Sequence, residues 1–327
     1  MGVTHRFICV YNRSQISPKI FRPHNMPKKF GDLHVCGVIL PVLYCQHKYQ
    51  NFSRTFVVVV KPFLKWAGGK FRILDKILAE IPKGSRFVEP FAGSCAVYLN
   101  IATEKALVCD INTDLIWLYK YIQSDGEHFI QYCKSFFTPE NNEQEIYMRI
   151  RDRFNSTSDQ SEKSAILLYL NRHSFNGLVR YNSKGGFNVP FGKYTSPYFP
   201  LDELRAFHRK TQITDTEFVC ADFRTIFKAL NYGDVVYCDP PYVPLSATAS
   251  FTTYAGNVFS SKDQAELASL SEMTCKKGIP VILSNHDTEE TRVLYASAEV
   301  RNFNVQRFIS CKGEGRGTAP ELLAIFK

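Results

Sequence analysis

Short apolar segments that alternate with helical ones constrain the fold of this chain more than any other feature. Alternating strands and helices predict an α/β fold around one sheet. The last segment is expected to return to the edge of that sheet as its final strand. The predicted strands are Arg86–Val88, Ala106–Cys109, Glu217–Cys220, Val235–Cys238, Val281–Asn285 and Glu321–Phe326.

The α/β alternation stops between Ile111 and Pro200, which predicts an inserted, mostly helical unit. Helices are expected in the insertion at Leu115–Ile122, Phe129–Phe136, Glu145–Phe154 and Ser164–Asn171. Outside it they are expected at Phe71–Ile81, from Cys95 to Ile101, and at Leu201–Lys210, Thr225–Leu230 and Lys262–Lys277.

Asp239, Pro240, Pro241 and Tyr242 directly follow the predicted strand Val235–Cys238. In open α/β sheets, ligands bind outside the carboxyl ends of the strands. Each proline fixes φ and lacks an N–H, so this turn is stiff and its carbonyls are not satisfied by a local ladder. It offers a carboxylate, a free carbonyl and an aromatic face, which suit a flat group bearing an NH2. A Pro-rich strand exit with a surface Asp is the alternative interpretation.

A second candidate site follows the first two strands. The loop Glu89–Ser94 resembles a Rossmann first turn, and Asp110 ends the next strand, 21 residues after Glu89. An acid at that position is placed to bind ribose hydroxyls. Because no G-x-G-x-x-G cradle for a pyrophosphate is present, a nucleoside without a diphosphate is expected. The glycines of Trp66–Lys70 suit a loop whose backbone approaches a ligand.

The segment Asn171–Pro200 combines basic and aromatic residues and contains no acid. Such a pattern suits contact with DNA. A Gly-rich hairpin with core aromatics is the alternative. The basic residues are Arg172, Arg180, Lys184 and Lys193, interleaved with Phe175, Tyr181, Phe187, Phe191, Tyr194 and Tyr198.

The net charge of +9 comes mainly from residues 1–60, which hold eight Lys or Arg and one Asp. The rest holds 32 basic and 30 acidic residues, so a nucleic-acid surface must be a local patch. Residues 1–60 lack a sustained period, although Val38–Leu40 and Val57–Val60 have strand-like composition. They are expected to lie outside the fold; a basic arm for nucleic acid is the alternative.

Ten scattered cysteines form no C-x-x-C pair and have no His at zinc spacing, which favours reduced, cytosolic usage and core packing over catalysis or metal binding. No apolar run is long enough to cross a bilayer, and the start lacks the pattern of a secretory signal.

Together these motifs resemble the Dam family of DNA adenine-N6 methyltransferases in the α arrangement, where the cofactor motif precedes the recognition domain and the catalytic motif follows it. Residues 1–60 have no counterpart in the family, Phe175 stands where Tyr is common, and Lys193 stands where Arg is common. The resemblance covers Lys61–Lys327 and rests on Phe63–Lys70, Phe87–Gly93, Asp110, Asn171–Tyr198, Asp239–Tyr242, Pro244–Ala249 and Ser284–Asp287.

The resemblance implies a Rossmann-like class I methyltransferase sheet from residues 61–112 and 201–327, with a DNA target-recognition domain at 113–200. It implies a cytoplasmic monomer, bacterial or phage-encoded, that needs no metal and acts on adenine in duplex GATC. S-adenosylmethionine would be held by Trp66, Lys70, Glu89, Phe91, Gly93, Asp110 and Asp239. DNA would be contacted by Lys65, Phe175, Asn176, Leu178, Arg180, Pro190, Lys193 and Tyr194, with Arg180 reading guanine.

The predicted mechanism follows from the weakness of an adenine amino group as a nucleophile. Asp239 and the Pro240 carbonyl would each accept one N6–H bond, and Tyr242 would stack on a base flipped out of the duplex. Two other functions stay open from the residues alone. One is methylation of another NH2 acceptor, an RNA base or a protein amide, although such enzymes favour Asn in place of Asp239. The other is a non-catalytic DNA-binding protein.

Overall fold

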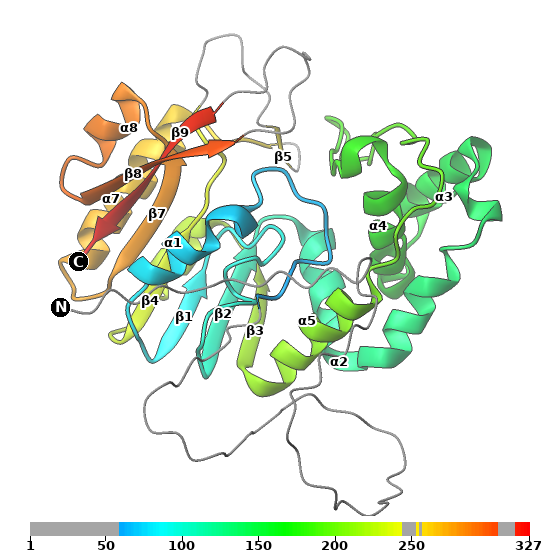
Figure 1. The fold of residues 1–327 in the computed structure, drawn as a ribbon, viewed down its shortest axis with the longest axis horizontal. Coiled ribbons are helices and arrows are strands. Elements are labelled where there is room, and N and C mark those ends of the chain that lie inside the picture. The colour runs from blue at the N-terminus through cyan, green and yellow to red at the C-terminus, as the bar shows by residue number, and fades with distance from the viewer. Residues whose placement is uncertain (1–58, 244–252, 255–256, 307–317) are drawn as a thin grey trace, which may run out of the picture. The chain divides into compact units, whose positions relative to one another are not determined.

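A seven-stranded sheet forms the centre of the unit Val60–Lys327 (Figure 1). The computed structural model describes residues 59–243, 253–254, 257–306 and 318–327. The predicted strand at Val38–Leu40, residues 57–58 of the strand-like run and the motif Pro244–Ala249 lie outside them.

The strand order of the sheet is β3-β2-β1-β4-β7-β9-β8. The first five strands in this order are parallel, and β9 and β8 add an antiparallel hairpin. The chain runs outward from β1 through β2 to β3 and then crosses to β4 on the other side of β1. This reversal is a topological switch point, where open α/β sheets bind their ligands. The strands are β1 Arg86–Glu89, β2 Lys105–Asp110, β3 Asp215–Cys220, β4 Asp234–Cys238, β7 Val281–His286, β8 Glu299–Gln306 and β9 Thr318–Phe326.

The α/β fold and the strands predicted from the sequence are confirmed, but the position of the last strand is wrong. Strand β9 lies between β7 and β8, and β8 is the edge. The residues Leu322–Phe326 are at most 2% exposed, as expected for a strand paired on both sides. Strand β8 has the sequence EVRNFNVQ, whose polar, exposed residues suit an edge but contain no apolar run to predict it.

The helix expected from Cys95 to Ile101 is absent, and turns occupy that segment. Cys95 has a φ of 59°, in the left-handed region that a right-handed helix cannot include. Two helices expected at Leu115–Ile122 and Phe129–Phe136 form one bent helix, α2. The bend lies at Gly126, where a Cβ atom would come within 2.6 Å of His208 Nε2.

The other predicted helices are confirmed with small shifts at their ends. In Figure 1 the green helices α3 and α4 stand beside the β3 side of the sheet. The helices are α1 Leu74–Glu80, α2 Thr113–Ser135, α3 Gln144–Ser156, α4 Gln160–His173, α5 Leu201–Ile213, α6 Phe223–Lys228, α7 Ser261–Cys275 and α8 Glu289–Leu294. Single 3-10 turns lie at Lys70–Ile73, Glu140–Asn142 and Phe175–Gly177, and the short strands β5 Thr253–Tyr254 and β6 Asn257–Val258 pair with each other.

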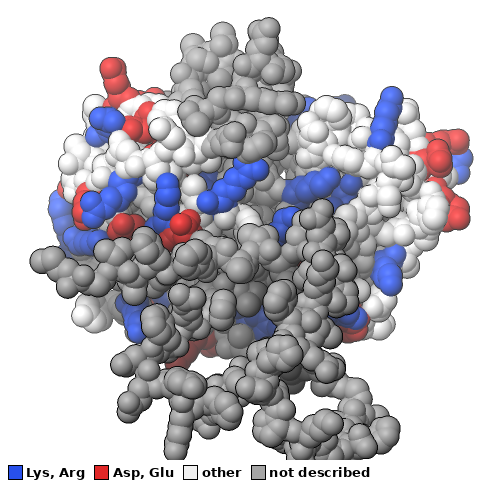
Figure 2. All heavy atoms as spheres, in the orientation of Figure 1, with Lys and Arg blue, Asp and Glu red and all other residues white. Residues whose placement is uncertain are grey.

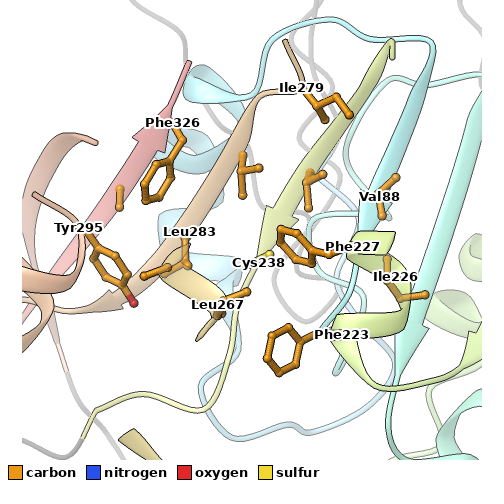
Figure 3. Packing of buried hydrophobic residues seen from close by; sticks show 14 of the residues in the cluster. Val88, Phe223, Ile226, Phe227, Cys238, Leu267, Ile279, Leu283, Tyr295 and Phe326 are labelled. Carbon is orange, nitrogen blue, oxygen red and sulfur yellow. The ribbon is translucent and has the colours of Figure 1, made fainter. Parts of the chain in front are cut away.

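A hydrophobic core cluster packs helices α6 and α7 against the sheet (Figure 3). Phe223 and Phe227 of α6 and Leu267 of α7 meet Val88 of β1 and Cys238 of β4 in this cluster. Full burial of an apolar side chain of this size stabilises the fold by about 1.5–3 kcal/mol. The core therefore fixes the carboxyl ends of β1 and β4 relative to the start of α7.

Candidate active site

The carboxyl ends of β1, β2 and β4 border a cleft of about 830 Å³. Its walls contain every residue that the sequence predicts for catalysis or cofactor binding. These residues come from three separate parts of the chain: Trp66 and Lys70; Glu89, Phe91, Gly93 and Asp110; and Asp239, Pro240, Pro241 and Tyr242.

Asp239 lies just beyond strand β4 and is held on one side of its carboxylate. Lys70 Nζ lies 2.8 Å from Asp239 Oδ1, and Ser284 Oγ of strand β7 donates to the same oxygen at 2.8 Å. The Lys70 side chain is only 6% exposed, and its ammonium also donates to Gly68 O at 2.5 Å. Both side chains approach Oδ1, and none of the residues that the structure describes is bonded to the second oxygen of Asp239.

Three groups fix the ring of Tyr242. Its hydroxyl donates to Glu321 Oε2 of strand β9 at 3.2 Å. The His286 ring packs against it edge-on, with centroids 4.7 Å apart, and Lys70 Nζ lies 4.5 Å from the ring centroid. Burial, with the nearby acids Asp239 and Glu321, raises the pKa of Tyr242 well above its usual range. The phenol therefore stays protonated, which does not suit Tyr242 to act as a base.

Glu89 is the most deeply buried acid of the cleft, at 2% exposure. Its Oε2 accepts a hydrogen bond from Tyr98 N at 3.3 Å. Burial raises its pKa well above the usual range, and the charges of Asp239 and Asp110 raise it further. Carboxyl groups outnumber basic side chains in the cleft, so a positively charged ligand would relieve their mutual repulsion. The carboxyl groups are those of Glu89, Asp110, Asp222, Asp239, Asp263 and Glu321, and the basic side chains are Lys70, Arg72 and Arg224.

Asp110 ends strand β2 and organises the glycine loop opposite. Its two oxygens accept hydrogen bonds from Gly93 N and Asn112 N, each at 2.9 Å. Gly93 has a φ of 45°, and a Cβ atom on it would lie 2.8 Å from Trp66 Nε1. Glycine is therefore required where the loop passes the ring of Trp66, which lines the cleft.

A fourth strand end, that of β3, contributes residues that the sequence analysis missed. Asp222 follows β3 as the N-cap of α6, and Phe223 beside it lines the cleft. The rings of Phe91, Phe223 and Phe259 form a wall with centroids 5.5–5.7 Å apart, which suits the face of a planar ligand. The sequence did contain a signal for Asp222, because this acid comes two residues after the end of β3, much as Asp110 stands at the end of β2. Gln264 and Glu321 were also missed, and Asn285 was quoted only within the motif Ser284–Asp287, without a role in the site. All three reach the site from distant parts of the sequence.

The residues predicted to contact DNA gather on the segment Ser174–Tyr194 and on Lys65 beside it. Val179 of this segment lines the same cleft as the Asp239–Tyr242 turn. Arg180 is exposed, and its guanidinium donates to Asn188 Oδ1 at 2.8 Å and to Asn188 O at 3.2 Å. In the view of Figure 2, Lys and Arg side chains lie on both sides of a central hollow.

The other predicted DNA residues differ in exposure. Phe175, Asn176, Pro190 and Lys193 are exposed, whereas Leu178 and Tyr194 are half-buried. The Tyr194 ring lies 4.2 Å from Lys65 Nζ, and both the N–H and the C=O of Lys65 are bonded to the Asn171 side chain. Asn171 therefore connects this segment to the loop that begins at Trp66.

The predicted basic and aromatic patch is smaller than expected. Arg172 is 8% exposed and donates to Phe63 O, so it supports the fold instead of facing DNA. Phe187 is 1% exposed and packs on Phe154, as the core interpretation predicts for that ring.

Among the described residues, no group of His, Cys, Asp and Glu has an arrangement that could hold a metal ion. In the same residues no helix is long and apolar enough to span a membrane. Burial raises the pKa of the thiols of Cys95 and Cys238, which favours packing over nucleophilic roles for them.

Comparison with known proteins gives concordant results. The model of the family described as D12 class N6 adenine-specific DNA methyltransferase matches residues 66–309. A DNA adenine methylase of Vibrio cholerae serotype O1 is 48% identical over 267 residues, which cover 81% of this chain and 96% of that protein. The DNA adenine methylase of Escherichia coli K12 is 44% identical over 267 residues, covering 82% and 95%. That of Haemophilus influenzae is 46% identical over 269 residues, covering 81% and 93%.

Proposed function

This chain belongs to the D12 class of N6 adenine-specific DNA methyltransferases, and we propose that its target is the adenine of GATC in duplex DNA. The family establishes the reaction, which is methylation of adenine N6 in DNA with S-adenosylmethionine as donor. The relatives named DNA adenine methylase support adenine in DNA as the target. The choice of GATC rests on the resemblance of the motifs to the Dam family. Methyl incorporation into duplexes with each base pair of GATC altered in turn tests this choice, and equal incorporation into all of them would contradict it.

The cleft fits S-adenosylmethionine, which supplies an electrophilic methyl group on a sulfonium when bound. Six carboxyl groups and three basic side chains, Lys70, Arg72 and Arg224, line the cleft, so it favours a cation. Phe91 and Phe223 offer faces to a purine. We assign the binding of the cofactor to Trp66, Lys70, Glu89, Phe91, Gly93, Asp110 and Asp239.

Asp110 provides a direct test of the cofactor site. We expect Asp110→Ala to raise the Kd for S-adenosylmethionine by ~10-fold or more, because a hydrogen bond to a charged group contributes about 1.5–3 kcal/mol. Isothermal titration calorimetry measures this change. Asp125→Ala, at an exposed position of α2, is the control. An unchanged Kd in Asp110→Ala would remove Asp110 from the cofactor site.

Glu89 predicts a link between cofactor binding and protons. Its raised pKa favours the protonated carboxyl, and the positive charge of the cofactor favours the carboxylate. Binding should therefore release protons from Glu89 and strengthen as pH rises. Calorimetry in two buffers of different ionisation enthalpy counts the protons released. We expect Glu89→Gln to release fewer protons on binding than the wild type. The cofactor's own amino group contributes equally to both proteins, so its titration drops out of the difference. Equal release in both proteins would refute the link.

The catalytic proposal assigns N6 of the adenine to the Asp239–Tyr242 turn. The second oxygen of Asp239 and the Pro240 carbonyl each accept one N6–H bond, which directs the nitrogen lone pair at the methyl group. Orientation of this kind supplies ~7–11 kcal/mol of catalysis. Tyr242 stacks on the adenine, which is flipped out of the duplex at a cost of a few kcal/mol.

One observation carries the proposal: the turn, the acids and Val179 of the segment Ser174–Tyr194 border a single cleft. We therefore propose residues 113–200 as the DNA target-recognition domain, inserted in a catalytic domain of residues 61–112 and 201–327. We propose that residues 1–59 lie outside the fold, one residue fewer than expected, because Val60 is hydrogen-bonded to the Asn100 side chain. Lys65, Phe175, Asn176, Leu178, Arg180, Pro190, Lys193 and Tyr194 contact DNA in this proposal. We also propose that the protein acts as a monomer.

A further inference from the structure

A buried pair of amides, Gln264 and Asn285, holds the catalytic turn from behind. Gln264 lies in the first turn of α7 and is 3% exposed; its Nε2 donates to Pro241 O at 2.6 Å. Asn285 lies in β7 and is fully buried; its Oδ1 accepts from Val243 N at 3.0 Å. The two amides also bond to each other, through Asn285 Nδ2 and Gln264 Oε1 at 3.1 Å.

The direction of every bond in this pair follows from its neighbours. Val243 N and His286 N can only donate, so the side-chain oxygen of Asn285 must face them. The Asn285 NH2 then faces Gln264, which must present its own oxygen in return. The Gln264 NH2 is left for Pro241 O, which can only accept. No other orientation of either amide satisfies these backbone groups.

The position of Gln264 is set by the start of helix α7. Ser260 caps this helix with a reciprocal capping box to Asp263, and Gln264 N donates to Ser260 O at 3.0 Å. Leu267, one turn later, packs in the core cluster with Cys238 of β4. The start of the helix therefore fixes the position of the Gln264 amide relative to the Asp239–Tyr242 turn.

The pair distinguishes two successive carbonyls of the turn. Pro241 O is occupied by Gln264, whereas no donor among the described residues is bonded to Pro240 O. Neither proline has an N–H that could fix the turn by a ladder bond. Gln264 and Asn285 thus hold the turn through Pro241 O and Val243 N and leave Pro240 O as the acceptor.

We propose that Gln264, oriented by Asn285, is a positioning residue that presents Pro240 O to the adenine amino group. This inference rests on the proposed mechanism, in which Pro240 O accepts one N6–H bond. Without the Gln264 donor, the Pro241 carbonyl loses its partner and the turn is free to rotate both carbonyls. The Asp239 carboxylate and the cofactor cleft keep their own contacts, to Lys70 and Ser284.

The test compares Gln264→Met, which keeps the length of the side chain but has no donor, with the wild type. We expect the single-turnover rate of methyl transfer on a GATC duplex to fall by ~10- to 10²-fold. The Kd values for S-adenosylmethionine and for DNA should stay within about twofold, because only the transition-state contact is lost. Gln264→Glu, which replaces the NH2 donor by an oxygen, should likewise lower the rate and leave both Kd values nearly unchanged. Gln144→Met and Gln144→Glu, at an exposed position, are the matched controls.

Circular dichroism at the assay temperature establishes whether each variant is folded. A folded Gln264 variant that transfers methyl groups at the wild-type rate would overturn the proposal. A loss of rate accompanied by equal losses of affinity for the cofactor and for DNA would also overturn it. Failure of both Gln264 variants to fold would do the same, because either result assigns Gln264 to stability alone. Asp239→Ala, assayed in parallel, separates the role of Gln264 from the mechanism on which it rests. Normal turnover in Asp239→Ala would reject the proposed mechanism itself.

Discussion

The Asp239→Ala variant is expected to transfer methyl groups at least ~10²-fold more slowly than the wild-type enzyme, by analogy with the loss of one preorganised hydrogen-bond partner in other active sites. The substitution removes one acceptor for the adenine N6–H and leaves the amino group unactivated. The affinity for DNA should change much less, because Asp239 lies in the cleft and not on the segment Ser174–Tyr194.

Single-turnover kinetics with a GATC duplex measure this effect. Asp239 also pairs with the buried Lys70 ammonium, so Asp239→Asn is the necessary control. It keeps an oxygen at the same position without the charge, and its rate should lie between those of Asp239→Ala and the wild type. Near-normal turnover in Asp239→Ala, with the protein folded, would reject the proposed activation of the adenine.

The second large effect is expected at Arg180. Arginine donates to O6 and N7 of guanine in the major groove, the commonest specific contact between proteins and DNA. Arg180 is exposed and bonded only to Asn188 among the described residues, at 2.8 and 3.2 Å, so a stronger acceptor can displace this partner. We expect Arg180→Ala to weaken the binding free energy for GATC by about 1–3 kcal/mol and to relax the sequence preference at one base pair.

A contact to phosphate predicts a different result for the same variant. It would weaken all sequences alike and reduce the salt slope by about one. Arg180→Ala is therefore assayed on GATC and on sites altered one base pair at a time, across a salt series. Lys184→Ala, an exposed basic residue of the same segment, is the control. Equal losses on every sequence, with a shallower salt dependence, would assign Arg180 to the DNA backbone.

The sequence predicted the parallel strands well because buried strands are continuous apolar runs. Val235–Cys238 and Val281–Asn285 are recognisable without any tertiary information. Strand β8 was missed because an edge strand keeps polar residues on its exposed side, and its partner β9 was placed at the edge as a result. The helix expected from Cys95 does not form because Cys95 has a positive φ, and helix propensity does not reveal such an angle.

The candidate site was predictable where its residues follow strands directly. Asp110 and the Asp239–Tyr242 turn each end a strand, so topology alone places them at the same edge of the sheet. The supporting residues were not predictable in this way. Gln264, Asn285 and Glu321 reach the turn from 23, 42 and 79 residues away in the sequence, and no local pattern marks those contacts.

The most direct test of the central claim is the transfer of tritium from S-adenosyl-[methyl-³H]methionine to duplex DNA, followed by digestion to nucleosides. The full chain should label a duplex that contains GATC, and the label should be recovered as N6-methyladenine. A duplex that differs only by exchange of the target A·T pair for G·C should stay unlabelled. Equal label in both duplexes, or label recovered in another base, would contradict the account.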